Sequence, residues 1–495
     1  MTDTSIFRKI ESWQSALGLL YVPLREGVED RQRYVLLNGL TGNFCLDFAP
    51  PDDPVTRRAT AWSSDVGHYV AVNNDVVTVH RWDRNAPTDR YSWGSVVERI
   101  RDFHRYLEKD DPDRSKSVVN HVLRVFRMIR AALQEREAAT HSLEILLYML
   151  ACGASRSDRS RLDAEQWGLS SDAVDHSTAL PAATWESLYS DLIGSGRYDV
   201  LRPDFELVLR HAAGTLFQEA HIEARVSPNY WLPGLESPVR LAAGARPTET
   251  GVYFTPPAIA RSLAEEAIRA IWNSVSPTIT IFDPACGSGE LLRECLRRLK
   301  LRGYNGRVKV VGFDSSASSV AMARFALASE KRYWPPNQVE ITVQQQNSLI
   351  ATWPAAVNIL IMNPPFQSWQ QMDSETQEAV TAVLGEQLKN KPNLAMAFAF
   401  RAVEAIAHDV GVLAMVAPSS LLEASSGKRV RETLAERLHP ILIAKLGHQR
   451  AFAHAFVDAG MYVGTTCQPS YSEAAVLWAD PQPASLNRAL RGLRR

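Results

Sequence analysis

The sequence predicts a parallel α/β domain in the second half of the chain, and three segments carry this prediction. A short β-type run, Thr280–Phe282, leads into a glycine-rich turn and a helical pattern. A second strand-like run, Val308–Phe313, ends in an acidic residue, and a third apolar run, Val357–Met362, ends in a proline-rich turn. Strands that alternate with helices in this way are typical of a parallel α/β sheet.

The first half of the chain shows two other patterns. Residues 1–110 alternate apolar and polar side chains with a period near two, which predicts a small β-rich module with a hairpin turn at Asn73–Asp75. Residues 111–240 show helical spacing and predict a mainly helical domain. A Ser/Asp/Arg-rich stretch near residues 154–176 predicts an exposed loop or a poorly ordered insert.

Proline-rich residues 226–250 mark the main expected domain boundary. We therefore expect the α/β domain over residues 241–470 and a basic tail over residues 471–495.

The composition restricts the classes of partner and compartment. Lys and Arg total 54 and Asp and Glu total 55, a net charge of -1, so a polyanion has to be met by a local basic surface. The five cysteines are scattered without metal-ligand spacing, which predicts reduced thiols and no metal site. No signal peptide and no long apolar run is evident, which predicts a cytoplasmic protein without membrane contact.

The glycine-rich turn, Asp283-Pro-Ala-Cys-Gly-Ser-Gly289, predicts a ligand site at the start of a helix. Glycines let a ligand approach the backbone, and the helix N-terminus offers free N–H groups. The leading acidic residue suits a cationic ligand better than a pyrophosphate. Asp314, at the end of the next strand, is placed to bind ribose hydroxyls, and its structural alternative is a helix N-cap.

The most informative segment is Asn363-Pro364-Pro365-Phe366. The Asn363 side-chain oxygen and the Pro364 carbonyl can both accept hydrogen bonds from one NH2 group, while the prolines remove competing N–H donors. An amine held in this way loses conjugation with its ring, so its lone pair becomes available to attack a methyl group. Phe366 offers a stacking face. The structural alternative is a stiff turn with an exposed aromatic residue.

Taken in this order, these motifs resemble the S-adenosylmethionine-dependent DNA adenine-N6 methyltransferases of the gamma class, the N-6 DNA methylase family, of the type I modification-subunit or type II restriction-modification kind. The resemblance covers residues 248–470 and implies a Rossmann-like, seven-stranded methyltransferase sheet. It also implies a set of cofactor-binding residues for S-adenosylmethionine. These are Tyr253, Thr255, Pro256, Asp283, Ala285, Cys286, Gly287, Gly289, Asp314, Ser315, Asn347 and Leu349.

Two positions depart from the family pattern. Asn347 stands where the family usually has an Asp near the adenine of the cofactor, and Asn358 stands where an Asp commonly precedes the catalytic strand. An amide oxygen accepts hydrogen bonds as a carboxylate does, but more weakly. Phe452 matches a family residue that contacts the extruded adenine, and ordinary core packing is its alternative.

The function implied is methyl transfer to the N6 amino group of a flipped-out adenine in double-stranded DNA, with Asn363, Pro364, Pro365 and Phe366 as catalytic residues and no metal. About 30 residues follow Val463, so we expect sequence recognition to come from a partner subunit or a missing segment in a restriction-modification or phage-defence system, and the alternative is an N-terminal half that reads DNA. Basic residues at 428–431 are either a phosphate contact or a solvated helix face. Alternatives are an RNA-adenine or protein-glutamine methyltransferase, and a catalytically silent binding subunit that keeps the fold.

Overall fold

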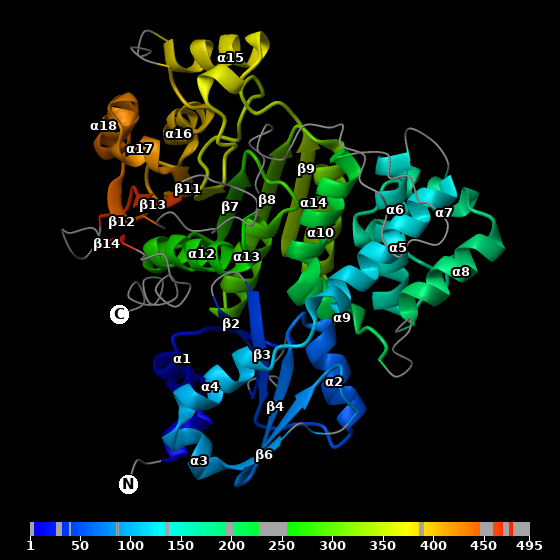
Figure 1. Cartoon of the computed structure of the whole chain (residues 1–495). Helices are drawn as coiled ribbons and strands as arrows, with labels where there is room; N and C mark the ends of the chain where they lie inside the picture. Colours follow the sequence, from blue (N-terminus) through cyan, green and yellow to red (C-terminus); the bar gives the residue numbers. More distant parts are fainter. Residues whose placement is uncertain are drawn as a thin grey trace. The chain divides into compact units, whose positions relative to one another are not determined.

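A computed structural model describes residues 4–25, 32–38, 41–85, 87, 89–133, 138–194, 201–226, 255–385, 391–445, 459–468 and 475–478. These residues fall into two compact units (Figure 1). The first holds residues 1–165 and 169–220, and the second holds residues 166–168 and 221–495.

The first unit contains a six-stranded sheet in the order β1-β2-β3-β4-β5-β6. Its strands are β1 (Leu20–Pro23), β2 (Arg33–Asn38), β3 (Thr41–Asp47), β4 (His68–Asn73), β5 (Val76–Arg81) and β6 (Asp89–Ser92). The predicted hairpin joins β4 and β5, because Asn73 pairs with Val76 and Asn74 adopts φ 46°, a left-handed conformation that Asn tolerates. Trp13 and Phe44 pack in the core of this unit.

In the first unit, one helix precedes the strands in the sequence, one lies between β3 and β4, and the others follow β6. These helices are α1 (Ile10–Leu17), α2 (Pro54–Ser63), α3 (Trp93–Glu98), α4 (Ile100–Lys109), α5 (Val118–Leu133), α6 (Ala138–Ser155), α7 (Ser171–Ala179), α8 (Ala182–Ile193), α9 (Phe205–Leu207) and α10 (Ala213–Val226), the last of which continues into the second unit. None of the described helices is long and apolar enough to cross a membrane.

The loop predicted near residues 154–176 is shorter than its composition indicates. Helix α6 continues to Ser155, and α7 begins at Ser171 because the Ser170 hydroxyl accepts a hydrogen bond from Ala173 N at 3.2 Å. Trp167, in the remaining loop, is 1% exposed and stacks on Phe325 with 5.6 Å between ring centroids, both within the second unit. The buried Trp167 side chain therefore anchors a segment that its amino-acid composition predicted to be exposed to solvent.

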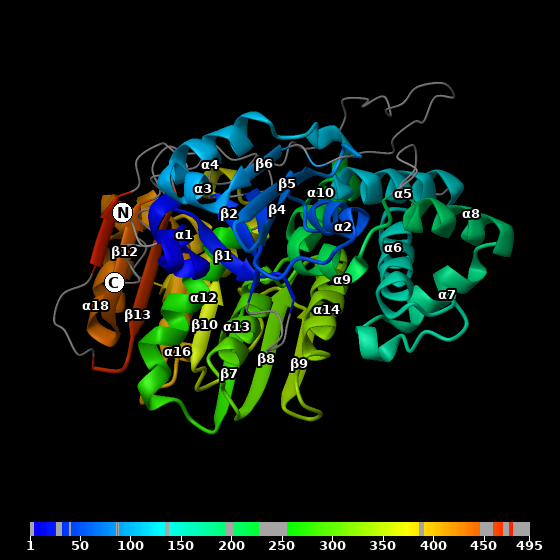
Figure 2. The same ribbon diagram turned by 90° about the horizontal axis from the view of Figure 1, so that it is seen from below.

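The second unit contains an eight-stranded sheet in the order β14-β12-β13-β11-β10-β7-β8-β9. Its strands are β7 (Thr278–Asp283), β8 (Arg307–Asp314), β9 (Val339–Gln345), β10 (Ile359–Met362), β11 (Val412–Pro418), β12 (His439–Lys445), β13 (Ala459–Thr465) and β14 (Ala475–Trp478). Strands β7 to β11 are parallel, and β13 runs antiparallel to its neighbours β11 and β12. Figure 2 shows β10, β7, β8 and β9 side by side.

Seven of these strands, β7 to β13, form the predicted Rossmann-like methyltransferase sheet. The eighth, β14, pairs parallel with β12 and lies within residues 471–495, for which the sequence indicated only a basic tail. A segment of four residues is too short to show a periodic pattern in the sequence, so it is the pairing with β12 that makes this segment a strand.

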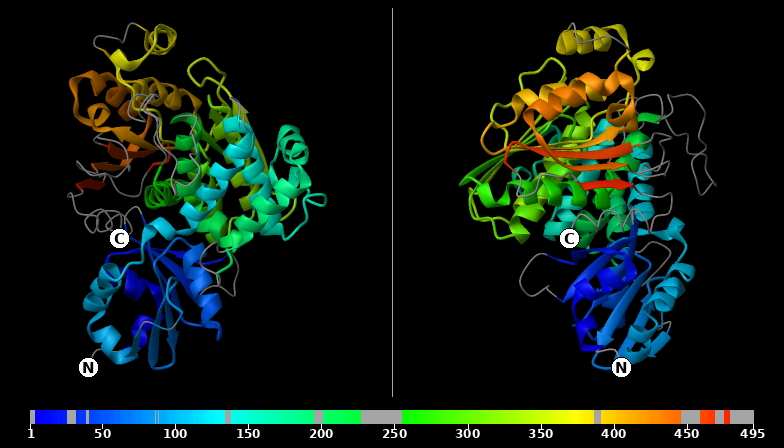
Figure 3. Two further views of the ribbon diagram at one scale, coloured as in Figure 1. Left: turned by 45° about the vertical axis from the view of Figure 1, so that its right-hand side comes forward. Right: turned by 90° about the vertical axis from the view of Figure 1, so that its left-hand side faces the viewer.

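Helices cover both faces of this sheet (Figure 3). They are α12 (Pro257–Ile271), α13 (Glu290–Leu301), α14 (Ala317–Lys331), α15 (Ser374–Leu384), α16 (Leu394–Ala405), α17 (Ser419–Glu423) and α18 (Lys428–Arg437). Helices α12, α13 and α14 pack in succession, while α15, α16 and α18 share an apolar core with Phe282 and Trp353. Because parallel strands end at the same edge of a sheet, this architecture gathers the predicted motifs there.

Candidate active site

The glycine-rich turn connects β7 to α13 and is held by backbone hydrogen bonds. Cys286 N donates to Phe313 O at 2.9 Å, and Gly289 N donates to Cys286 O at 2.8 Å. Gly289 has φ 81°, and a Cβ atom there would lie 3.3 Å from the Cα atom of Ala323 in α14. The turn therefore needs glycine at residue 289, both for its left-handed backbone and for its close approach to α14.

Asp314, at the end of β8, connects the glycine-rich turn to the start of α14. One carboxylate oxygen accepts a hydrogen bond from Gly287 N at 2.9 Å, and the other accepts one from Ser316 N at 2.9 Å. The N-cap of α14 is Ser316, whose hydroxyl accepts from Ser319 N, so Asp314 lies two residues before the cap. The alternative that Asp314 is the helix N-cap is therefore wrong.

Asp283 is almost completely buried at the end of β7, with 1% of its surface exposed. Its Oδ1 accepts a hydrogen bond from Ala285 N at 2.9 Å, and its Oδ2 has no hydrogen-bond partner among the described residues. Burial raises the pKa of Asp283 well above 3.8; the Ala285 bond lowers this pKa and the charge of Asp314 raises it. A cationic group beside Oδ2 would satisfy the buried carboxylate.

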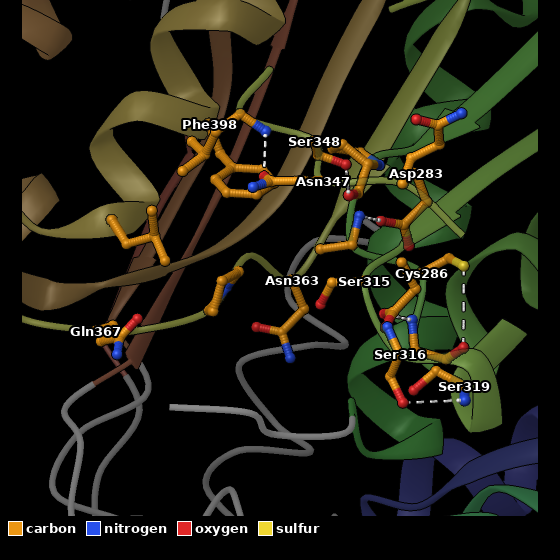
Figure 4. Close-up of a pocket in the computed structure, with 18 of the residues that line it drawn as sticks. Asp283, Cys286, Ser315, Ser316, Ser319, Asn347, Ser348, Asn363, Gln367 and Phe398 are labelled. Atoms are coloured by element: carbon orange, nitrogen blue, oxygen red, sulfur yellow. Dashed lines mark hydrogen bonds between the residues drawn. The ribbon is translucent and has the colours of Figure 1, made fainter. Parts of the chain in front are cut away.

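A cavity of about 510 Å³ opens at the edge of the sheet where these strands end. Eleven predicted site residues line it: Thr255, Asp283, Ala285, Cys286, Gly287, Asp314, Ser315, Asn347, Leu349, Asn363 and Pro365. In Figure 4, Asn363 lies between Gln367 on one side and Ser315 and Ser316 on the other. The cavity therefore brings the glycine-rich turn, Asp314 and the Asn-Pro-Pro-Phe turn to one place.

The remaining predicted residues fall into two groups. Pro256, Gly289, Pro364 and Phe366 are described and neighbour lining residues along the chain, and Phe366 is 7% exposed. Tyr253 and Phe452 lie outside the described residues. Their roles, and the stacking role of Phe366, stay predictions.

The Asn-Pro-Pro-Phe turn follows β10, whose four residues are all buried. Its far side is held by α16, since Leu394 N donates to Gln367 O at 2.9 Å and Asn393 caps that helix by accepting from Ala395 N at 2.9 Å. Asn363 is half-buried and faces the cavity. A fully buried strand and a capped helix thus fix the two ends of the turn.

The structure explains one of the two departures from the family pattern, Asn358, and is compatible with either residue type at position 347. Asn347 Oδ1 accepts a hydrogen bond from Leu349 N at 3.1 Å, which a carboxylate would also do. Asn358 Oδ1 accepts from Thr280 N at 2.9 Å, and its Nδ2 donates to Val410 O at 2.9 Å. Asn358 therefore uses both halves of its amide to hold β7 against the residues before β11, a pairing in which a carboxylate would lack the donor.

Several cavity residues were not predicted from the sequence. They are His221, Pro284, Ser288, Glu290, Leu291, Ser316, Ser319, Gln346, Ser348, Gln367, Asp373, Thr376, Leu394 and Phe398. Phe398 lies in α16, and the aromatic side chains of that apolar segment were a usable signal. His221 belongs to α10, far upstream in the chain, and no local pattern marks it.

No group of three or more metal-ligating side chains occurs within the described ranges.

Burial raises the pKa of the Cys286 thiol well above 9.0, with the charges of Asp314 and Asp283 acting in the same direction. The thiol in the cavity is therefore protonated and is a poor nucleophile.

Residues 239–447 match the N-6 DNA Methylase family model. The chain is 24% identical over 228 residues to the type II methyltransferase M.BanIII of Aneurinibacillus aneurinilyticus, covering 44% of this chain and 38% of that protein. It is 22% identical over 191 residues to the modification methylase CviBIII of Paramecium bursaria Chlorella virus NC1A, covering 38% of this chain and 42% of that protein. The chain thus spans about two fifths of the length of these relatives.

The fold is also similar to that of a protein solved by cryo-EM as the DrdV–DNA complex. The TM-score is 0.54 with 12% sequence identity, and the match covers 99% of this chain and 56% of that chain. At this identity the similarity concerns the fold alone.

The family and the fold imply S-adenosylmethionine as the cofactor, and the cavity residues fit it. The unsatisfied Oδ2 of Asp283 suits a cationic group, and the Asp314 carboxylate suits ribose hydroxyls. The glycine-rich turn lets a ligand approach the backbone. Residues 239–447 are thus similar to the N-6 DNA methylase family.

Proposed function

We propose that this chain transfers the methyl group of S-adenosylmethionine to the N6 amino group of an adenine that is rotated out of double-stranded DNA. The observation that carries the proposal is that Asn363 lines the same cavity as Asp283 and Asp314. An amide acceptor for an amine and the carboxylates of the cofactor site then line one cavity. Asn363→Ala should remove transfer without removing cofactor binding.

Asn363 and Pro364 hold the target amine in this proposal. The Asn363 side-chain oxygen and the Pro364 carbonyl accept the two N–H bonds of N6, which draws the nitrogen lone pair out of conjugation with the ring. Bound S-adenosylmethionine supplies an electrophilic methyl group on a sulfonium. The N6 lone pair would form the new N–C bond as the methyl–sulfur bond breaks with its electron pair on sulfur, so that S-adenosylhomocysteine is the leaving group, and N6 would afterwards lose one proton to solvent.

The two acceptor oxygens also stabilise the transition state. Positive charge develops on N6 as the N–C bond forms, and the oxygens of Asn363 and Pro364 lie where that charge appears. Phe366 is proposed to stack on the adenine ring, and Phe452 has the same proposed role. Positioning and charge stabilisation suffice for this reaction, so no general base is assigned.

The basic residues of α18, Lys428, Arg429 and Arg431, make contacts within the chain. Arg431 donates hydrogen bonds to Leu421 O at 2.8 Å and Ala424 O at 2.9 Å, and Lys428 and Arg429 both lie within 4 Å of Glu432. These contacts favour the interpretation of these basic residues as a solvated helix face over that of a phosphate contact. We propose that a specificity subunit or a further segment reads the DNA sequence, in a restriction-modification setting that the names of the two curated relatives support.

The test uses tritium-labelled S-adenosylmethionine with three classes of acceptor: DNA, RNA and protein. The DNA set includes an oligonucleotide duplex with an unpaired adenine, because an adenine that is already unstacked is cheaper to extrude. We expect label in DNA, at N6-methyladenine after hydrolysis to nucleosides. Label in RNA or in protein glutamine alone would contradict the proposal, as would cofactor binding with no transfer to any of the DNAs.

A further inference from the structure

His221 is an unexpected member of the cavity wall. It belongs to α10, which precedes all the cofactor motifs in the sequence, and it is 3% exposed. It lines the cavity together with Asp314, Ser316 and Ser319. A buried imidazole in a cofactor site needs an explanation because burial of a polar ring is costly unless hydrogen bonds satisfy it.

A chain of short contacts connects His221 to Asp314. His221 Nδ1 lies 3.1 Å from Ser318 Oγ, and Ser318 Oγ lies 2.9 Å from Ser316 Oγ. The backbone N–H of Ser316 donates to Asp314 Oδ1 at 2.9 Å. Two serines, Ser318 and Ser316, therefore connect the His221 imidazole to the Asp314 carboxylate.

The direction of these hydrogen bonds depends on which His221 nitrogen carries the proton. Each hydroxyl has one proton to donate and two lone pairs to accept with. If Nδ1 carries the proton, His221 donates to Ser318 and Ser318 donates to Ser316, whose own O–H remains available to the cavity. If Nδ1 is unprotonated, the chain reverses, and the Ser316 proton is used on Ser318.

The first arrangement complements a ribose. Ser316 Oγ then accepts from Ser318 and from Ser319 N, the latter at 3.5 Å, and directs its O–H toward the ligand. A ribose hydroxyl that donates its proton to the Asp314 carboxylate still has lone pairs to be satisfied. Beside that carboxylate, a donor is needed more than another acceptor.

We propose that His221 is a positioning residue of the cofactor site, which fixes the Ser318 and Ser316 hydroxyls so that Ser316 donates to the ribose beside Asp314. The proposal rests on the proposed function, because it takes the ligand to be S-adenosylmethionine. His221 acts through the two serines and takes no part in methyl transfer.

The test is calorimetric binding of S-adenosylhomocysteine to the full chain. His221→Phe keeps a planar aromatic ring, slightly larger than the imidazole, without hydrogen-bonding nitrogens, and should weaken binding roughly 5- to 20-fold, the loss of about one hydrogen bond to the ligand. His221→Asn places an amide donor near the position of Nδ1 and should restore affinity to within about threefold of the native chain. Rescue by Asn distinguishes a hydrogen-bonding role from packing alone.

Non-additivity gives a second readout. Ser316→Ala should weaken binding, and the double variant His221→Phe/Ser316→Ala should bind no more weakly than Ser316→Ala alone, because both changes remove the same donor. Where His221→Phe does not unfold cooperatively, Ser318→Ala replaces it in the cycle. Unchanged affinity in His221→Phe or Ser318→Ala, or fully additive losses, would overturn the proposal.

The outcome for the native chain separates this inference from the function itself. Native chain that fails to bind S-adenosylhomocysteine would overturn the proposed function together with this role. Native binding that is unaffected by the His221 and Ser318 variants would overturn only the role of His221.

Discussion

The Asp314 carboxylate accepts a hydrogen bond from the backbone N–H of Gly287 at 2.9 Å, across two neighbouring strands. Its other oxygen accepts from Ser316 N at the same distance. One side chain thus orders the glycine-rich turn and the start of α14, and the same residue lines the cavity. Scaffold and ligand site share this residue.

Asp314→Ala should therefore impair both stability and binding. The variant loses two backbone hydrogen bonds to a carboxylate and the acceptor for the ribose, so S-adenosylhomocysteine affinity should fall roughly 10- to 100-fold and the melting temperature should also fall. Calorimetry and thermal unfolding measure the two effects. A variant that binds as well as the native chain would show that Asp314 is only structural.

Asp283→Asn should separate stability from binding. Because the pKa of Asp283 is raised in the folded chain, the folded state holds more protons than the unfolded state above about pH 3.8, and stability falls as pH rises through that window. At neutral pH the neutral amide removes this cost while keeping the acceptor for Ala285 N. The ligand-free variant should be about 1 to 3 kcal/mol more stable.

The same variant should lose affinity for the cationic cofactor, since the amide cannot neutralise a positive group. In the native chain, cofactor affinity should rise with pH as Asp283 ionises. Denaturant unfolding at several pH values and calorimetry check both statements. An Asn variant that is less stable at neutral pH, with unchanged affinity, would contradict this role of Asp283.

Glu294, on α13, tests a buried ion-pair network. Arg297 bonds Glu294 and Glu330, each at 2.8 Å, and all three side chains are buried. Burial favours the neutral form of Glu294, but the guanidinium groups of Arg297, Arg298 and Arg261 lower its pKa to about 2. The stability that Glu294 contributes is present above its ordinary pKa of 4.5 and is lost as pH falls toward 2.

Glu294→Gln should cost about 3 kcal/mol or more of unfolding free energy at neutral pH, because it leaves a buried guanidinium partly uncompensated. Glu432→Gln is the matched control: it makes the same chemical change in a pair whose side chains are exposed, and should cost less than about 1 kcal/mol. Denaturant unfolding compares them. Equal losses in the two variants would contradict a stabilising role for the buried network.

The sequence predicted those parts of the site that lie directly after strands of the parallel sheet. Asp283, Asp314 and Asn363 each follow an apolar run, and parallel pairing of those runs is sufficient to bring their ends together. Hydrophobic period and turn chemistry are local signals, so they are readable without a structure.

The parts that could not be predicted depend on contacts between distant segments. His221 reaches the cavity only because the end of α10 lies beside Ser318, and β14 is a strand only because it pairs with β12. The sequence showed that Asn358 departs from the family pattern. The hydrogen bonds that explain an amide at this position join it to Thr280 and Val410, which are remote in sequence. Tertiary pairing of this kind leaves no mark on local periodicity.

Methyl transfer by Asn363→Ala, with S-adenosylmethionine binding measured on the same preparation, tests the catalytic role of Asn363 most directly. The variant removes the side-chain acceptor for the N6 amine and leaves Asp283 and Asp314 intact. We predict cofactor affinity within about threefold of the native chain and a loss of N6-methyladenine formation of at least about 100-fold. Native levels of N6-methyladenine from this variant would contradict the assignment of Asn363 as the residue that holds the reacting amine.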